Sequence, residues 1–128
     1  MVNESRAIIL FAHGAREAEW AQPFTTIQEL VRQKLPDTRV ELAFLEIMQP
    51  SLPETIRHLA ATGVNHIQII PLFLAQGGHL KHDLPRLVDK LRREHPRLSI
   101  AVSPAIGESD AILKRIAEWA CTEDKPSI

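Results

Sequence analysis

The sequence predicts one α/β domain, in which helices cover both faces of a four-stranded parallel sheet. Short apolar runs alternate with amphipathic stretches along the 128 residues, in strand–helix order. Such alternation is typical of parallel strands joined by right-handed helical crossovers. A chain of this length also suits a single domain, given the usual ~100–200 residues per domain. We therefore expect flavodoxin-like winding over residues 1–128, with a core spanning about residues 7–120.

Four apolar runs carry the strand prediction, over residues 7–12, 40–45, 67–73 and 98–102. The first and third runs are almost continuously apolar, which is typical of strands buried on both faces of a parallel sheet. The second run alternates apolar and polar residues more strictly. We therefore expect the first and third strands near the centre of the sheet and the second strand at an edge.

A helix is expected after each strand, because apolar residues recur there at spacings of three and four. Each set forms a stripe along one helix face. The stripes are Phe24, Ile27, Val31 and Leu35; Leu52, Ile56, Leu59 and Ala60; Leu84, Leu87, Val88 and Leu91; and Ile112, Leu113, Ile116 and Ala120.

Capping residues agree with these helices. Ser51 and Glu54 fit a capping box at the start of the second helix. Gly63 stands where the end of that helix favours a left-handed residue. Asp83, followed by Pro85, predicts the start of the third helix.

Composition excludes several classes of protein. The 15 Lys and Arg residues balance the 16 Asp and Glu residues, so a basic nucleic-acid binder is not indicated. The single cysteine, Cys121, allows neither an internal disulfide nor a cysteine-based zinc site. No apolar run approaches the ~20 residues that span a bilayer, so no membrane contact is expected. The N-terminus shows no signal-peptide pattern, and we expect a reducing, cytoplasmic location.

A nucleotide cofactor is not indicated either. The turn after the first strand lacks the glycine pattern of dinucleotide-binding proteins, and no phosphate-binding P-loop sequence is present.

Polar and glycine-rich segments follow the strands. His13 comes after the first strand, Glu46 after the second, and residues 74–78 with His79 after the third. In open parallel sheets, ligands bind outside the carboxyl ends of the strands. If the first and third strands are neighbours, their ends lie ~5 Å apart. His13 and His79 could then contact one ion.

Imidazole and carboxylate groups suit borderline divalent metals such as cobalt, iron, nickel and zinc. A neutral imidazole can instead accept a proton near neutral pH. Gly77 and Gly78 would let the backbone approach a bulky ligand and adopt unusual dihedral angles. A simpler role stays open for Glu46, which could merely pair with Arg16 or Arg57.

The remaining histidines are expected to be structural or solvated. His58 falls on the polar face of the second helix, His66 precedes the third strand, and His95 closes a helix. His82 follows His79 by three residues and could share its helical face, but solvent exposure is the favoured interpretation.

Six short motifs occur in a fixed order along the chain, at residues 13–16, 43–46, 50–52, 71–74, 78–79 and 83–85. Taken together and in this order, they resemble the small, single-domain sirohydrochlorin chelatases, the CbiX-type class II chelatases. The resemblance covers about residues 8–116. One departure is Ala15, where the family usually has serine, so a hydroxyl near His13 is lost.

The resemblance implies a chelatase-like fold and insertion of a divalent metal into sirohydrochlorin without ATP. Cobalt is favoured as the metal, with Fe²⁺ or Ni²⁺ as alternatives. By the same resemblance, His13 is the proton acceptor and a metal ligand, and His79 is the second ligand. The resemblance also implies that the tetrapyrrole contacts Glu46, Leu74, Ala75, Gln76, Gly77 and Gly78.

Three cations, Arg16, Lys81 and Arg86, could pair with the carboxylates of such a substrate. One sheet edge offers one wall to a macrocycle that has two faces. We therefore expect a homodimer whose clefts oppose each other, since two-fold dimers are the commonest oligomers. The alternative function is a metal or tetrapyrrole carrier on the same fold, because fold alone does not establish catalysis.

Overall fold

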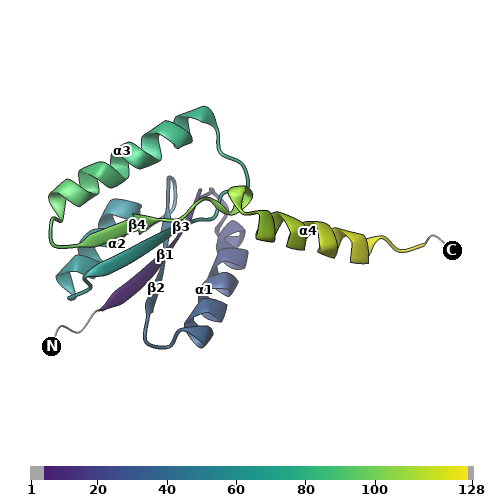
Figure 1. The fold of residues 1–128 in the computed structure, drawn as a ribbon, viewed down its shortest axis with the longest axis horizontal. Coiled ribbons are helices and arrows are strands. Elements are labelled where there is room, and N and C mark those ends of the chain that lie inside the picture. The colour runs from purple at the N-terminus through teal and green to yellow at the C-terminus, as the bar shows by residue number, and fades with distance from the viewer. Residues whose placement is uncertain (1–4, 127–128) are drawn as a thin grey trace.

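The fold was described from a computed structural model, which covers residues 5–126 (Figure 1). The four expected strands and four expected helices are present, with two short 3-10 helices between them. None of the helices within residues 5–126 has the length and apolar character needed to cross a membrane. The elements are β1 (Arg6–Ala12), η1 (Ala18–Ala21), α1 (Gln22–Lys34), β2 (Arg39–Phe44), α2 (Leu52–Ala61), β3 (His66–Pro71), α3 (Gly78–Glu94), β4 (Ser99–Val102), η2 (Ile106–Glu108) and α4 (Asp110–Glu123).

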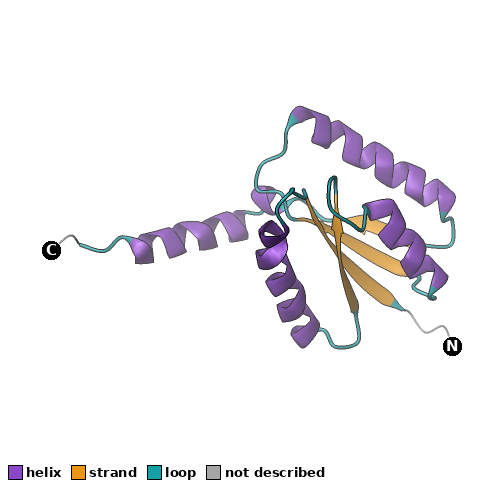
Figure 2. Cartoon of the chain, turned by 180° about the vertical axis from the view of Figure 1, so that it is seen from behind, coloured by secondary structure: helices purple, strands orange, loops and turns teal. Residues whose placement is uncertain are grey.

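The sheet is parallel throughout, in the order β2-β1-β3-β4. This confirms the expected fold class, the central position of β1 and β3, and the edge position of β2. Helices α2 and α3 lie on one side of the sheet and α1 on the other (Figure 2). Because β1 pairs directly with β3, the segments that follow these two strands begin side by side at the carboxyl edge.

The main core lies between the sheet and helices α2 and α3. Alternate residues of the central strands, such as Ile9, Phe11 and Ile69, are fully buried there. The capping predictions for α2 are also confirmed. The Ser51 hydroxyl accepts a hydrogen bond from the Glu54 N–H at 3.3 Å, and Gly63 has φ +91° after the last turn.

The start of α3 differs from the prediction. The helix begins at Gly78, and Pro85 lies inside it rather than in its first turn. Leu80 is buried and extends the apolar stripe of Leu84 by one turn toward the N-terminus. Proline removes one backbone hydrogen bond, to the residue four places earlier, and burial of Leu80 compensates for that loss. As a result, His79 lies on the first turn of a helix and not in a loop.

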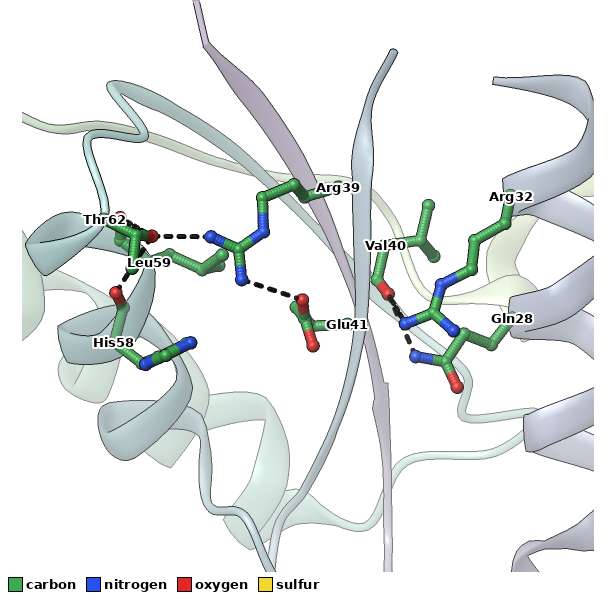
Figure 3. A network of polar contacts seen from close by, with 8 residues as sticks. All are labelled: Gln28, Arg32, Arg39, Val40, Glu41, His58, Leu59 and Thr62. Carbon is green, nitrogen blue, oxygen red and sulfur yellow. Dashed lines mark hydrogen bonds and ion pairs between the residues drawn. The ribbon is translucent and has the colours of Figure 1, made fainter. Parts of the chain in front are cut away.

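On each edge strand of the sheet, one backbone carbonyl accepts hydrogen bonds from side chains of a flanking helix. On β2, the Val40 carbonyl accepts hydrogen bonds from Gln28 and Arg32 of α1, each at 2.9 Å (Figure 3). On β4, the Ile100 carbonyl accepts two hydrogen bonds from Arg92 of α3, at 3.1 and 2.8 Å. A free edge strand is a template for pairing with another chain, so these contacts disfavour sheet extension.

Helix α4 carries the expected apolar stripe but does not pack on the sheet. It contacts η2 and projects away from the rest of the molecule (Figures 1 and 2). No residue of α4 is buried. Among the described residues, the hydrophobic core cluster extends along the chain from Ala7 to Ala105.

Candidate functional site

His13 and Glu46 start from adjacent backbone at the carboxyl edge. The pairing of β1 with β2 continues past the strands, because the Leu45 N–H donates to the Ala12 carbonyl at 2.9 Å. The Glu46 N–H then donates to the His13 carbonyl at 3.1 Å. Both side chains are exposed. The structure therefore places an imidazole and a carboxylate at neighbouring positions on the edge where ligands bind parallel sheets.

Gly14 makes this close approach possible. Its φ is +95°, and a Cβ at this position would lie 1.9 Å from the Glu46 carbonyl oxygen. No other residue type fits there without moving the turn after β2. That turn is itself tight, since the Met48 N–H donates to the Glu46 carbonyl at 2.7 Å.

The His13 ring lies edge-on to Phe73, with ring centroids 4.8 Å apart. Phe73 is buried and lies edge-on to Phe11, with centroids 5.5 Å apart. Such arrangements match the positive edge of one ring to the negative face of the other. Within residues 5–126, no hydrogen bond occupies a His13 ring nitrogen. Both nitrogens are therefore available to a proton or a metal ion.

The segment between β3 and α3 is held from two sides. The Leu72 N–H donates to the Phe11 carbonyl at 2.8 Å, and the Gly107 N–H of η2 donates to the Phe73 carbonyl at 3.1 Å. A Cβ at Gly107 would lie 1.6 Å from the Leu74 carbonyl oxygen. The backbone is fixed closely in this way, while the Leu74 side chain stays exposed.

The unusual dihedral angles expected at Gly77 and Gly78 are not found. Gly77 caps α3 in an extended conformation, with φ −71° and ψ 164°, and neither glycine has a positive φ. A Cβ at either position would meet no atom within 4 Å. The fold itself therefore does not require glycine here, and open space lies beside this part of the chain.

His79 and His82 are both exposed on the first turns of α3. Residues three apart on a helix are neighbours on its surface. Within residues 5–126, no hydrogen bond, ion pair or ring contact joins His79 to His13 or Glu46, and there is no group of three side chains that could hold a metal ion. The structure thus brings His13 beside Glu46, while the pairing of His13 with His79 on one ion stays a prediction.

The charged groups around this edge lack partners in the described chain. Arg16, Lys81 and Arg86 are exposed, and none of the ion pairs within residues 5–126 includes them. No ion pair joins Glu46 to Arg16 or to Arg57 either, so the structural role considered for Glu46 is not supported.

The hollows at this edge are shallow. One of about 200 Å³ is lined by residues that include Phe73, Leu74 and Lys81. A neighbouring hollow of about 380 Å³ lies between α3 and the end of β4. A larger hollow of about 410 Å³ lies at the amino edge of the sheet, beside Asn65 and His95. The volume of the hollows therefore does not identify the functional site. The candidate site is identified instead by the chemistry of His13 and Glu46 at the carboxyl edge.

Two features of the site were not expected from the sequence. Ile47 is exposed beside Glu46 with φ +69°, a conformation that β-branched residues rarely adopt. Nothing in the local sequence signals it. Gly107 supports the segment at Leu74 from a distant part of the chain. The only signal for this role in the sequence is the presence of a glycine in the segment that follows the fourth strand.

Comparison with known proteins gives a consistent result. The family model described as CbiX matches residues 7–122. The sirohydrochlorin cobaltochelatase of Sulfurisphaera tokodaii is 30% identical over 111 residues, which cover 87% of this chain and 88% of that protein. The sirohydrochlorin cobaltochelatase of Methanothermobacter thermautotrophicus is 38% identical over 81 residues, or 63% of this chain. The match spans only 56% of that relative's length.

Solved structures agree on the fold. The crystal structure of a putative cobalamin biosynthesis CbiX protein from Marinobacter aquaeolei has a TM-score of 0.79 and 30% identity, covering 92% of this chain and 96% of that one. The sirohydrochlorin chelatase SirB from Bacillus subtilis subspecies spizizenii, solved with cobalt, has a TM-score of 0.76 and 24% identity. The match covers 93% of this chain and 51% of SirB.

Proposed function

This chain belongs to the CbiX family, and we propose that it is a sirohydrochlorin chelatase that inserts a divalent metal into the tetrapyrrole without a nucleotide. The observation that carries the proposal is the His13 imidazole, which stands on the ligand-binding edge with both ring nitrogens free. The relatives named sirohydrochlorin cobaltochelatase support sirohydrochlorin as the substrate.

His13 is proposed to act as the general base. Insertion removes two N–H protons from the macrocycle for each divalent ion that enters, so a proton acceptor must stand near the centre of the ring. A positioned imidazole supplies a typical rate gain of ~10²–10⁴. The buried Phe73 ring behind His13 supports this role, because it restricts the imidazole without occupying its nitrogens.

His13 and His79 are proposed to hold the incoming metal, which is a substrate of the reaction. A chelatase must release the ion to the macrocycle, and a closed four-ligand cage would retain it. Borderline divalent ions accept imidazole ligands readily.

The tetrapyrrole is proposed to lie against Glu46 and the segment 74–78. The exposed Leu74 side chain offers an apolar contact to the flat ring, and the open space beside Gly77 leaves room for it. Arg16, Lys81 and Arg86 would pair with the substrate's carboxylates, since their charges have no partner in the described chain.

Cobalt is the metal that we propose first. The relatives from Sulfurisphaera and Methanothermobacter are cobaltochelatases, whereas a Bacillus subtilis relative with 25% identity is a ferrochelatase. Iron and nickel therefore stay as alternatives, because imidazole ligands alone do not select among these ions. We further propose a reducing, cytoplasmic location, in keeping with the free, exposed Cys121. We also propose a homodimer, because the carboxyl edge of one copy offers a wall to only one face of a flat macrocycle.

The test is the absorbance of anaerobic sirohydrochlorin mixed with Co²⁺ or Fe²⁺, with and without the protein. Wild type should produce the metallated spectrum much faster than the control without protein. His13→Ala and His79→Ala should lose this acceleration, whereas the matched control His58→Ala, on the exposed face of α2, should retain it.

The same measurement separates the chelatase from a carrier. A carrier needs no general base, so its pigment spectrum would shift on binding while metal entry stayed at the uncatalysed rate. That outcome would overturn the proposed chelatase activity in favour of the carrier.

A further inference from the structure

Ile47 adopts a backbone conformation that isoleucine rarely takes. Its φ is +69°, and the Met48 N–H donates a hydrogen bond of 2.7 Å to the Glu46 carbonyl, so residues 46–48 form a γ-turn centred on Ile47. A γ-turn with a positive φ at its centre is the rare and strained form. For a β-branched residue a positive φ is a steric outlier, whereas glycine adopts it at little cost. The local backbone therefore favours glycine at a position that holds isoleucine.

Burial does not explain the isoleucine either. Ile47 is 61% exposed, and the hydrophobic core cluster of the described residues does not include it. An apolar side chain that is both strained and exposed contributes little to the folding of the free chain. Residues in such conformations cluster at ligand clamps and active sites, where the surrounding structure holds them in place. The conformation of Ile47 therefore points to a role in binding.

Hydrogen bonds fix this turn beside His13. The Glu46 N–H donates to the His13 carbonyl at 3.1 Å, and the Phe44 N–H donates to the Pro50 carbonyl at 2.9 Å. The first bond ties the start of the γ-turn to the end of β1, and the second closes the loop at its base. The backbone of Ile47 is therefore held at a set position relative to the proposed base before any ligand binds.

Ile47 has a counterpart on the other side of His13. The sheet order β2-β1-β3 places the end of β1 between the ends of its two neighbours. Ile47 follows β2 and Leu74 follows β3, and Leu74 is 58% exposed. Adjacent strands lie ~5 Å apart, so the two flanking strands are ~10 Å apart. A broad, flat ligand centred on the imidazole would reach both apolar side chains.

The charge at this edge indicates which class of ligand fits. Arg16, three residues after His13, is exposed, and no ion pair within residues 5–126 includes it. Two apolar side chains and a cation without a partner favour a ligand with an apolar face and acidic groups at its rim. A tetrapyrrole that carries carboxylates has both features, whereas a hydrated metal ion alone has neither.

We propose that Ile47 packs against the face of the tetrapyrrole, and that its strained turn holds the side chain ready for this contact. The inference rests on the proposed chelatase function and adds a substrate-binding residue to the site. Contact would remove apolar surface of the side chain and of the ring from water, which favours binding. Because the turn fixes the backbone in the free protein, less conformational freedom is lost when the ring binds.

The first test separates folding from binding. Ile47→Gly relieves the backbone strain, so its midpoint of urea unfolding should equal or exceed that of wild type. The Kd for metal-free sirohydrochlorin, from anaerobic absorbance titration, should rise by about tenfold because the apolar contact is lost. A glycine variant that binds the pigment as tightly as wild type would overturn the proposal. A midpoint clearly below that of wild type would overturn the argument from strain.

The second test asks whether the apolar side chain or the stiffness of the turn governs binding. Ile47→Leu keeps the apolar volume and should bind the pigment within about twofold of wild type. Ile47→Asn is polar but tolerates a positive φ, so its Kd should rise as in the glycine variant. Leu30→Asn on α1, where Leu30 is 52% exposed, is the matched control and should bind like wild type. Equal binding by the leucine and asparagine variants would overturn the contact.

Metal insertion is measured in parallel, so that the two proposals fail differently. Suppose that wild type accelerates metal entry while the Ile47 variants bind the pigment unchanged. That result would overturn the contact and leave the chelatase intact. Pigment binding that weakens in the glycine and asparagine variants, without acceleration of metal entry by wild type, would support the contact and contradict the chelatase.

Discussion

The imidazole of His13 stands edge-on to the ring of Phe73, at a centroid distance of 4.8 Å and an angle of 63° between the ring planes. His13 follows β1 and Phe73 follows β3, so this contact joins the ends of two neighbouring strands. Phe73 lies at the margin of the core and is only 2% exposed. The orientation of the proposed base therefore depends on core packing and not on a hydrogen bond.

The orientation of His13 by the Phe73 ring can be tested with a smaller side chain at position 73. Phe73→Leu should lower kcat by about tenfold or more, because misplacing a catalytic group by a fraction of an ångström weakens proton transfer. KM should change little. Ile56→Val on α2 is the control, since it removes volume from the same buried core at a residue that makes no ring contact with Phe73 or His13. Both variants should lose about 1–2 kcal/mol in denaturant unfolding.

Equal loss of kcat in the two variants would mean that general softening of the core, rather than the His13–Phe73 contact, limits the reaction. Steady-state kinetics of metal insertion, measured on both proteins at matched concentrations, decide between these outcomes.

Gly14→Ala is predicted to destabilise the protein by more than about 2 kcal/mol, because the new methyl group would overlap the Glu46 carbonyl and the backbone would keep a positive φ. Gly63→Ala has a positive φ but open space around it, so it should cost only about 1 kcal/mol. Urea unfolding of both variants checks the difference. Equal losses of unfolding free energy in the two variants would show that the positive φ alone, and not the close approach of the Glu46 carbonyl, explains why glycine is needed at position 14.

The proposed role of the cations predicts a salt-dependent affinity. Lys81→Ala combined with Arg86→Ala should raise KM severalfold at low salt while kcat is retained. The effect should shrink at about 0.5 M salt, because exposed charges are screened over a few ångströms there. Arg97→Ala, at the amino edge of the sheet, should leave KM unchanged. A double variant with the KM of wild type would exclude these two side chains from substrate binding.

Much of this architecture is predictable from local sequence patterns. The nearly continuous apolar runs predict β1 and β3 as buried strands, and the parallel order brings the segments bearing His13 and His79 to one edge. That the two strands are neighbours stayed a condition at the level of sequence, and the sheet order β2-β1-β3-β4 supplies it. The start of α3 was missed because the cap signal at Asp83 was stronger than the single apolar residue Leu80. A tertiary contact decided the outcome there, as burial of Leu80 extends the helix past a proline.

The features that escaped prediction depend on contacts between distant segments. The left-handed conformation of Ile47 occurs in the turn whose Glu46 carbonyl lies against Gly14, 33 positions earlier along the chain. The exposure of α4 could not be predicted, because an apolar stripe on a helix has the same sequence pattern whether or not the helix packs on its own sheet. An amphipathic pattern predicts which face of a helix is apolar, but it does not predict which surface that face contacts.

Gly77 offers the sharpest test of where the tetrapyrrole lies. A methyl group at Gly77 would meet no protein atom within 4 Å, and the residue already has dihedral angles that alanine adopts. Gly77→Ala should therefore leave the free energy of unfolding within about 0.5 kcal/mol of wild type. If the macrocycle lies against this segment as proposed, the methyl group should raise the Kd for the pigment by about tenfold, because it occupies space that the ring needs. Titration of pigment absorbance against each protein, with thermal unfolding alongside, measures both quantities. Unchanged binding in a stable Gly77→Ala variant would place the tetrapyrrole elsewhere on the carboxyl edge, nearer to Glu46 than to the start of α3.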